Sequence, residues 1–98
     1  MDSFVYFKIL KNGFDKYPDI TYRLSVTGES MLPTLKNGQR ITIASKKDIS
    51  IGDIILFCKF NDHFTLHRVV KILNIDNKIY YQTKGDGYNK IDNYFHYY

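Results

Sequence analysis

The chain divides into short apolar or alternating runs that are separated by residues typical of turns. Two of these runs, Phe64 to Leu73 and Lys78 to Thr83, are divided by Asp76-Asn77. Val, Ile, Tyr and Phe favour sheets, and Asp and Asn tolerate the backbone of a tight turn. Short strands at this spacing predict a mainly β domain, either a small sandwich or a partly closed barrel. The other predicted strands are Tyr22 to Val26, Arg40 to Ala44 and Ile54 to Phe60, with turns at Ile51-Gly52-Asp53 and Asn61-Asp62-His63.

The N-terminal segment fits two interpretations. Ser3 to Asn12 could form a short amphipathic helix, with Asp2 or Ser3 as its N-cap and Gly13 as its C-terminal stop. The same segment could form a strand, because its Val, Tyr, Phe and Ile residues favour sheets.

Length, charge and cysteine usage limit the class of protein. With 98 residues, of which 44% are hydrophobic, the chain can bury one modest core, so we expect a single domain over residues 1–98. The net charge of +4 is spread along the chain and does not by itself indicate a nucleic-acid partner. Cys58 is the only cysteine, which favours a reducing, cytoplasmic compartment. No apolar run approaches the roughly 20 residues of a membrane span, so we expect a soluble chain without a transmembrane anchor.

Three groups of residues have a chemical interpretation. Ser30 lies in a turn beside the bulky Met31, from which a turn that only reverses the chain would gain nothing. A serine is a poor nucleophile unless a base takes its proton, and an imidazole is a better base when a carboxylate orients it. His67 and the carboxylates Asp86 and Asp92 provide these groups. Each residue alone also has an ordinary explanation: a turn serine, a histidine in a sheet, and an aspartate beside glycines in a turn.

Four motifs follow one another between about Leu24 and Asp92: Gly28-Glu29-Ser30-Met31-Leu32-Pro33-Thr34, Gly52-Asp53-Ile54-Ile55, His67-Arg68-Val69-Val70, and Lys84-Gly85-Asp86 with Asp92 six residues later. In type and order they resemble the motifs of type I signal peptidases and of LexA-type self-cleaving repressors, the S24/S26 serine peptidases. In bacterial signal peptidases the third motif begins with a lysine. His67 stands there in this chain, which is similar to the endoplasmic-reticulum and archaeal branch with its Ser, His and Asp.

The resemblance implies a barrel-like fold and a serine endopeptidase that needs no cofactor. It implies Ser30 as nucleophile, His67 as general base, Asp92 as the orienting carboxylate and Asp86 as a supporting one. The backbone N–H of Ser30 would stabilise the oxyanion. Many bacterial members carry a hydroxyl side chain two residues before the nucleophile, but Gly28 stands there and cannot supply that second donor. The implied substrate is a peptide or protein precursor, for example the leader of a ribosomally made peptide.

We also expect the side chains around Ser30 to hold its turn in place. Met31 and Pro33 would pack and stiffen the turn, so that the hydroxyl points into a groove.

Other chemistries fit the sequence less well. His63 and His67 would lie roughly 13 Å apart along a strand, too far to share a metal ion, so we expect no metal site. Cys58 lies in mid-strand, without the loop or helix terminus that would activate a thiol, and is interpreted as structural. Twenty-nine residues of this sequence precede Ser30, too few for a helix-turn-helix beside a strand, so we do not expect a self-cleaving repressor with a DNA-binding domain.

Two binding functions remain as alternatives. An inactive relative could hold a leader peptide by strand addition. A small barrel with nine Tyr, seven Phe and a positive charge balance could instead bind single-stranded nucleic acid. However, the aromatic residues cluster in Tyr94-Phe95-His96-Tyr97-Tyr98, which could equally form an edge strand or a tail that docks a partner.

Overall fold

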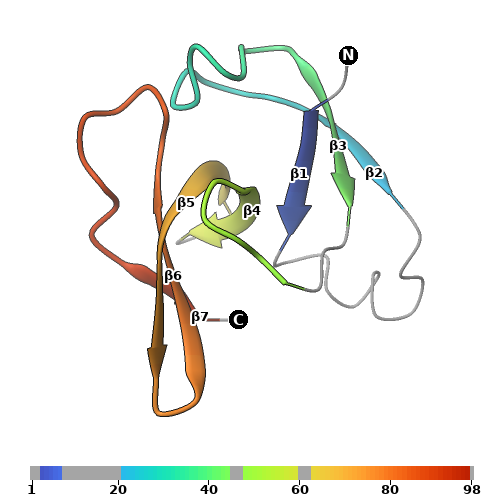
Figure 1. Cartoon of the computed structure of the whole chain (residues 1–98). Helices are drawn as coiled ribbons and strands as arrows, with labels where there is room; N and C mark the ends of the chain where they lie inside the picture. Colours follow the sequence, from blue (N-terminus) through green and yellow to red (C-terminus); the bar gives the residue numbers. More distant parts are fainter. Residues whose placement is uncertain (1–2, 8–20, 45–47, 60–62, 98) are drawn as a thin grey trace.

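The protein is mainly β. The computed structural model describes residues 3–7, 21–44, 48–59 and 63–97, and these contain seven strands and no helix (Figure 1). The strands are β1 (Ser3–Phe7), β2 (Tyr22–Ser25), β3 (Arg40–Ala44), β4 (Ile54–Lys59), β5 (His63–Ile75), β6 (Lys78–Lys84) and β7 (Phe95–Tyr97). The predicted fold class is therefore confirmed, and the strand boundaries predicted from the sequence differ by a few residues at most.

The N-terminal segment is a strand where it is described. β1 pairs in parallel with β3 on one side and with β4 on the other, and so lies inside the sheet. The expectation of a helix is wrong for Ser3–Phe7, because Val5, Tyr6 and Phe7 suit a strand that two neighbours flank. The predicted helix stop at Gly13 lies outside the described residues.

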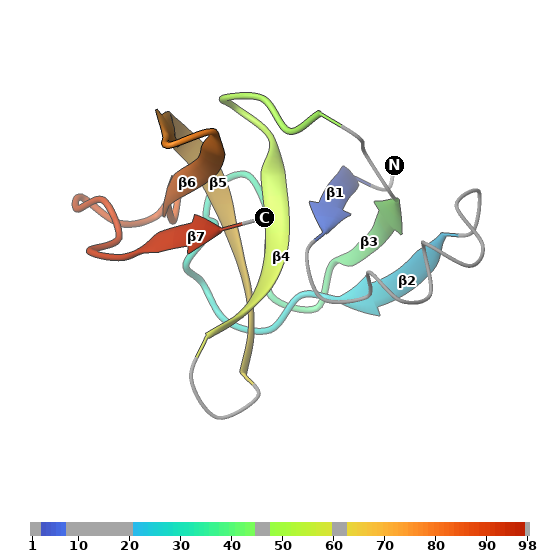
Figure 2. The ribbon, with the colours of Figure 1, turned by 90° about the horizontal axis from the view of Figure 1, so that it is seen from below.

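The seven strands form one hydrogen-bonded order, β2-β3-β1-β4-β5-β6-β7. Figure 1 shows β1, β2 and β3 along their lengths on one side, and β6, β7 and the second part of β5 on the other, with β4 and the first part of β5 nearly end-on between them. In Figure 2, after a quarter turn, β4 and β5 run across the molecule between the same two groups. This mixed sheet is therefore strongly twisted, with the twist that β-sheets generally have.

The long strand β5 joins the two halves of the sheet. Its residues 63–68 pair with β4, and from Arg68 onward it pairs with β6. The register with β6 shifts between Val69 and Lys71, and such an irregularity bends a strand and changes the direction of its side chains. His67 lies just before this change of partner, opposite Ile55 of β4.

The turn between β5 and β6 agrees with the prediction. Asp76 and Asn77 both have positive φ, 52° and 66°, which matches the two-residue turns that keep paired strands in register. Pairing therefore continues up to the turn, where Ile75 pairs with Lys78. The strand before the turn thus ends two residues later than predicted. At the preceding hairpin, Asn61 and Asp62 lie outside the described residues. His63, expected in that turn, belongs to β5.

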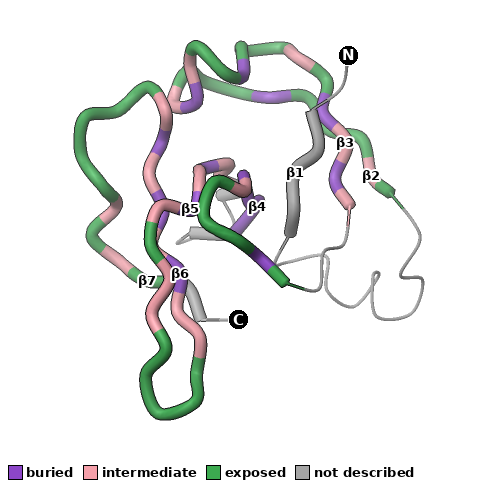
Figure 3. Tube along the Cα trace, viewed as in Figure 1, coloured by how far each residue is buried: buried purple, intermediate pink, exposed green. Residues whose placement is uncertain are grey.

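The described core consists of two apolar clusters that meet at β4. Alternate residues of a strand point to opposite faces, so Ile54 and Leu56 pack in one cluster and Ile55 and Phe57 in the other. This explains why β4 is a continuous apolar run. Figure 3 shows the buried positions concentrated near β3, β4 and β6, whereas the tip of the β5–β6 hairpin is exposed. Each buried Leu, Ile or Phe side chain contributes roughly 1.5–3 kcal/mol.

Candidate functional site

Ser30 lies in a tight turn between β2 and β3. Gly28 opens the turn with φ of 93°, and its N–H donates to Asn37 Oδ1 at 2.9 Å. The N–H of Leu32 donates to the carbonyl of Glu29. Met31 is buried, as expected, with only 2% of its surface exposed. Pro33 is exposed, so the expectation that it packs is wrong: the proline lies on the solvent side of the turn, and Met31 provides the packing.

The segment after β6 packs against this turn. The N–H of Gly87 donates to the carbonyl of Ser30 at 2.9 Å, and the N–H of Asp86 contacts Met31 Sδ at 3.4 Å. Gly85 fills the space between Ser30 and His67. A methyl group added to Gly85 would lie 2.6 Å from the Ser30 carbonyl oxygen and 3.1 Å from His67 Nε2. The imidazole edge that carries Nε2 and the backbone of Ser30 therefore meet at this glycine.

Gly85→Ala is expected to reduce the peptidase activity that the resemblance implies about 100-fold, because the methyl group must displace either the Ser30 backbone or the imidazole. It should also lower the free energy of unfolding by about 1–3 kcal/mol. The control is Gly38→Ala, where φ of 84° strains an alanine but no atom lies within 4 Å of the added methyl. Both variants should lose stability, and only Gly85→Ala should lose activity in an assay below its melting temperature. Equal activities would show that the contact at Gly85 is unimportant.

His67 and Asp92 form a buried hydrogen-bonded pair. His67 Nδ1 lies 2.6 Å from Asp92 Oδ2, and the two side chains are only 6% and 11% exposed. The hydroxyl of Thr83, itself fully buried, donates to the same carboxylate oxygen at 2.7 Å. A carboxylate can only accept hydrogen bonds, so the proton of a neutral His67 is on Nδ1 and Nε2 keeps its lone pair. The backbone of Asp92 is also held, because its N–H donates to the carbonyl of Thr83.

Aromatic rings fix the position of the imidazole. Phe57 and Tyr88 each meet it edge-on, with ring centroids 5.9 Å away in both cases. Tyr94 contacts Phe57 in the same way, and its hydroxyl is buried. Burial, and then the nearby charge of Asp92, raise the pKa of Tyr94 to about 12, so its hydroxyl stays neutral at physiological pH. The surroundings of His67 are thus largely apolar, with a single carboxylate on its Nδ1 side.

Asp86 lies at a different place from Asp92. Its two carboxylate oxygens accept hydrogen bonds from Nε and Nη2 of Arg68 at 2.9 and 2.7 Å, and Thr34 donates a third at 2.6 Å. Arg68 also donates to the carbonyl of Gly52 at 2.7 Å. Four segments therefore meet here: the Ser30 turn, the turn before β4, β5, and the segment after β6. The hydrogen bond between the two side chains is the main cause of both pKa shifts: it lowers the pKa of Asp86 and raises the pKa of Arg68.

Asp86→Asn is expected to lower the free energy of unfolding by about 1–2 kcal/mol at neutral pH, because Arg68 loses its charged partner. The pKa of Asp86 is lower in the folded than in the unfolded protein. Its stabilising effect is therefore complete above the unfolded value, about 3.9, and is lost as the pH falls through the lower folded value. Urea unfolding between pH 7 and pH 2 should show the difference between wild type and variant shrinking below about pH 4.

The control for this measurement is Asp76→Asn, which removes the same charge from the exposed hairpin tip, where Asn tolerates positive φ. If the difference in free energy of unfolding between Asp86→Asn and wild type did not change with pH, the Asp86–Arg68 ion pair would not be the source of this stability.

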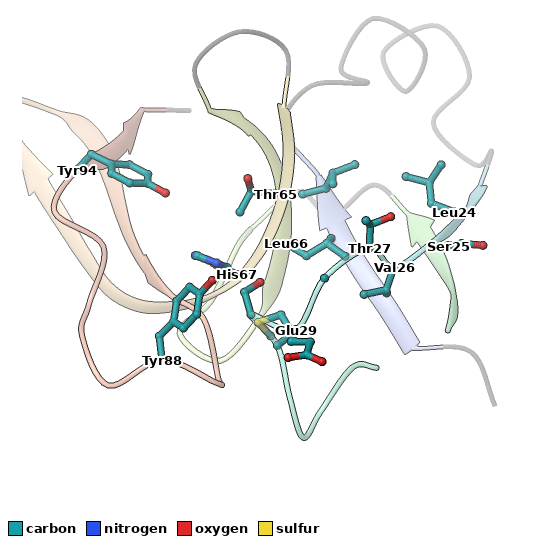
Figure 4. A pocket seen from close by; sticks show the side chains of 14 residues that line it. Leu24, Ser25, Val26, Thr27, Glu29, Thr65, Leu66, His67, Tyr88 and Tyr94 are labelled. Carbon is teal, nitrogen blue, oxygen red and sulfur yellow. The ribbon is translucent and has the colours of Figure 1, made fainter. Parts of the chain in front are cut away.

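A pocket of about 550 Å³ borders both the Ser30 turn and His67 (Figure 4). Its walls come from the segment 24–31, from β4 and β5, and from the segment after β6. The alternating pattern of the sequence does not indicate which strand residues face a shared cavity, so sequence reasoning misses these walls. They include Leu24, Ser25, Val26, Thr27, Glu29, Leu56, Thr65, Leu66, Tyr88 and Tyr94.

The other candidates add no second site in the described part of the chain. Cys58 lies within β4, opposite Phe64, and its side chain, like that of His63, lies outside the described residues. Among the residues that are described, no group of three or more His, Cys, Asp or Glu side chains could hold a metal ion. The same residues include no helix that is long and apolar enough to cross a membrane.

Comparison with known proteins identifies the family. A family model described as Peptidase S24-like matches residues 4–93, which include all four motifs and both members of the His67–Asp92 pair. No curated protein and no solved structure matches the chain significantly. Since the match covers most of the sequence, the chain belongs to the Peptidase S24-like family, a family of serine peptidases.

Proposed function

We propose that the protein is a serine endopeptidase in which Ser30 is the nucleophile, His67 the general base and Asp92 the carboxylate that orients His67. The observation that carries this proposal is the buried His67–Asp92 pair, whose imidazole has its free Nε2 on the side of the Ser30 turn. This arrangement supports the Ser, His and Asp chemistry of the endoplasmic-reticulum and archaeal signal peptidases.

In the first step Ser30 Oγ attacks the carbonyl carbon of the scissile peptide, and Nε2 of His67 takes the hydroxyl proton. Asp92 stabilises the resulting imidazolium through Nδ1. The tetrahedral intermediate then collapses, and the imidazolium passes its proton to the leaving amine. A water molecule, deprotonated by the same nitrogen, hydrolyses the acyl-enzyme and regenerates the serine.

The backbone N–H of Ser30 is the proposed oxyanion donor. Among the described residues this N–H has no hydrogen-bond acceptor, whereas the Ser30 carbonyl is occupied by Gly87. A donor that has no partner in the resting protein is available to hydrogen-bond the oxygen that becomes negatively charged in the transition state.

The pocket supports binding of an extended peptide. Residues 63–67 of β5 pair with β4 on one edge, and pairing with β6 begins only at Arg68. The pocket lies between Thr65 and Leu66 of this strand and the segment from Leu24 to Gly28 (Figure 4). A substrate segment in this space can add main-chain hydrogen bonds to the strand while its scissile bond lies at Ser30. The substrate we propose is a flexible precursor segment, such as the leader of a ribosomally made peptide.

A serine-reactive fluorophosphonate probe tests the proposal. The probe should label the wild-type protein at Ser30, as located by mass spectrometry of the digested adduct. Labelling should be absent in Ser30→Ala and strongly reduced in His67→Ala. A well-folded wild-type protein that is not labelled, and that cuts none of the peptides encoded by neighbouring genes, would instead be a peptide-binding module.

A further inference from the structure

Among its described lining residues, the pocket beside Ser30 carries one carboxylate. Glu29 is the only Asp, Glu, Lys or Arg in this described lining, and apart from His67 the other residues are apolar or carry hydroxyl groups. The Glu29 side chain is exposed and has no ion pair or hydrogen bond with any residue in the described part of the chain. It is therefore available to a ligand, and it directly precedes the proposed nucleophile.

Tyr88 lies at the same end of the pocket. Tyr88 is 53% exposed, and its ring makes the edge contact with His67. The preceding residue, Gly87, packs against the Glu29 backbone: a methyl group added to Gly87 would lie 2.9 Å from the Glu29 carbonyl oxygen. Figure 4 shows Glu29 on the side of the pocket where Tyr88 and His67 lie, with Leu24 and Ser25 at the far end.

A carboxylate and an exposed aromatic ring together suit a cation. The carboxylate provides a charged hydrogen-bond acceptor, and the face of a tyrosine ring attracts an ammonium or guanidinium group. We propose that Glu29 and Tyr88 form a subsite for a lysine or arginine side chain of the substrate, close to the scissile bond. This inference rests on the proposed peptidase function, because it defines the class of substrate for the same pocket.

The subsite also selects against other side chains. A substrate that covers Glu29 with an apolar residue removes water from the carboxylate without replacing its hydrogen bonds, and an acidic residue adds repulsion. The net charge of +4 does not attract cations over long distances, so the preference must arise locally in the pocket. The sequence of the cut precursor is therefore expected to contain Lys or Arg at a fixed distance from the cleaved bond.

A binding experiment on the Ser30→Ala protein tests the subsite without cleavage. The probes are fluorescein-labelled ten-residue peptides of Ala, Ser and Gly with one Lys placed at each position in turn, and matched peptides with the uncharged analogue norleucine. At one position we expect the Lys peptide to bind about five- to tenfold more tightly by fluorescence anisotropy. Adding Glu29→Gln should reduce this ratio to near one, and Glu29→Lys should make a Glu peptide the tighter ligand. Tyr88→Leu should reduce the ratio and Tyr88→Phe should keep it, whereas the control Asp76→Asn should leave it unchanged.

The outcomes separate this inference from the proposed function. Equal binding of Lys and norleucine peptides, binding of neither up to millimolar concentration, or a Lys preference that survives Glu29→Gln would each overturn the subsite. Cleavage of the same peptides by the protein with Ser30 intact tests the peptidase function independently. A Lys preference that depends on Glu29, without any cleavage, would support the subsite and contradict the peptidase function.

Discussion

Ser30→Ala and His67→Ala are each expected to remove nearly all peptidase activity, on the order of 10⁴- to 10⁶-fold in kcat, and the double variant should be no worse than either single one. The reason is that the two groups act in one step of the proposed mechanism, in which the hydroxyl attacks only when Nε2 of His67 takes its proton. The measurement is kcat and KM on one peptide that the wild type cleaves.

Stability measurements provide the control for this prediction. Ser30 is only half-buried and its described hydrogen bonds use its backbone, so Ser30→Ala should unfold at nearly the wild-type temperature. His67 is 5% exposed and holds Asp92, so His67→Ala leaves a buried carboxylate with fewer partners and should be less stable. His67→Gln, which keeps a polar side chain of similar reach, separates lost stability from lost chemistry. A double variant far less active than both single variants would show that Ser30 and His67 act independently.

The positions of β2 to β6 could be predicted because each of these strands has a local signal. The Asp76-Asn77 turn and the apolar run of β4 each depend on residues adjacent in sequence, and the structure agrees with both predictions. The place of Ser3–Phe7 could not be predicted, because the same residues fit an amphipathic helix. Its strand conformation depends on β3 and β4, more than thirty residues away in sequence.

In the candidate site, likewise, the sequence identifies the residues but not which of them lie side by side. The motifs identify Ser30, His67, Asp86 and Asp92, but their spacing does not show which carboxylate lies beside the imidazole. That depends on the bend of β5 and on the path of the segment after β6, which brings Asp92 to His67 and leaves Asp86 with Arg68. Thr83 carries no sequence signal, because a threonine in a strand is ordinary. Its importance follows only from its buried hydrogen bond to Asp92.

Because Asp92 contacts His67 and Asp86 contacts Arg68, we expect the second large effect on activity at Asp92 alone. Asp92→Asn is expected to lower kcat/KM roughly 10³- to 10⁴-fold, whereas Asp86→Asn should have a much smaller effect on activity. Asp92 Oδ2 accepts from both His67 Nδ1 and the Thr83 hydroxyl. An asparagine has one acceptor oxygen and one NH₂ group, so the imidazole can face the NH₂ group with Nδ1 as acceptor. The ring proton is then on Nε2, which can no longer take the proton of Ser30.

Thr83→Val distinguishes this loss of the correct tautomer from a general loosening of the site. Valine has the shape of threonine without its hydroxyl, so Asp92 keeps His67 but loses the 2.7 Å hydrogen bond from Thr83. This variant should lose about 1–2 kcal/mol of stability and roughly tenfold in activity, far less than Asp92→Asn. Kinetics of Asp92→Asn, Asp86→Asn and Thr83→Val on one peptide, each at a temperature where circular dichroism shows a folded protein, decide the assignment. Full activity of Asp92→Asn would mean that His67 needs no carboxylate, and a greater loss in Asp86→Asn would assign the orienting role to Asp86.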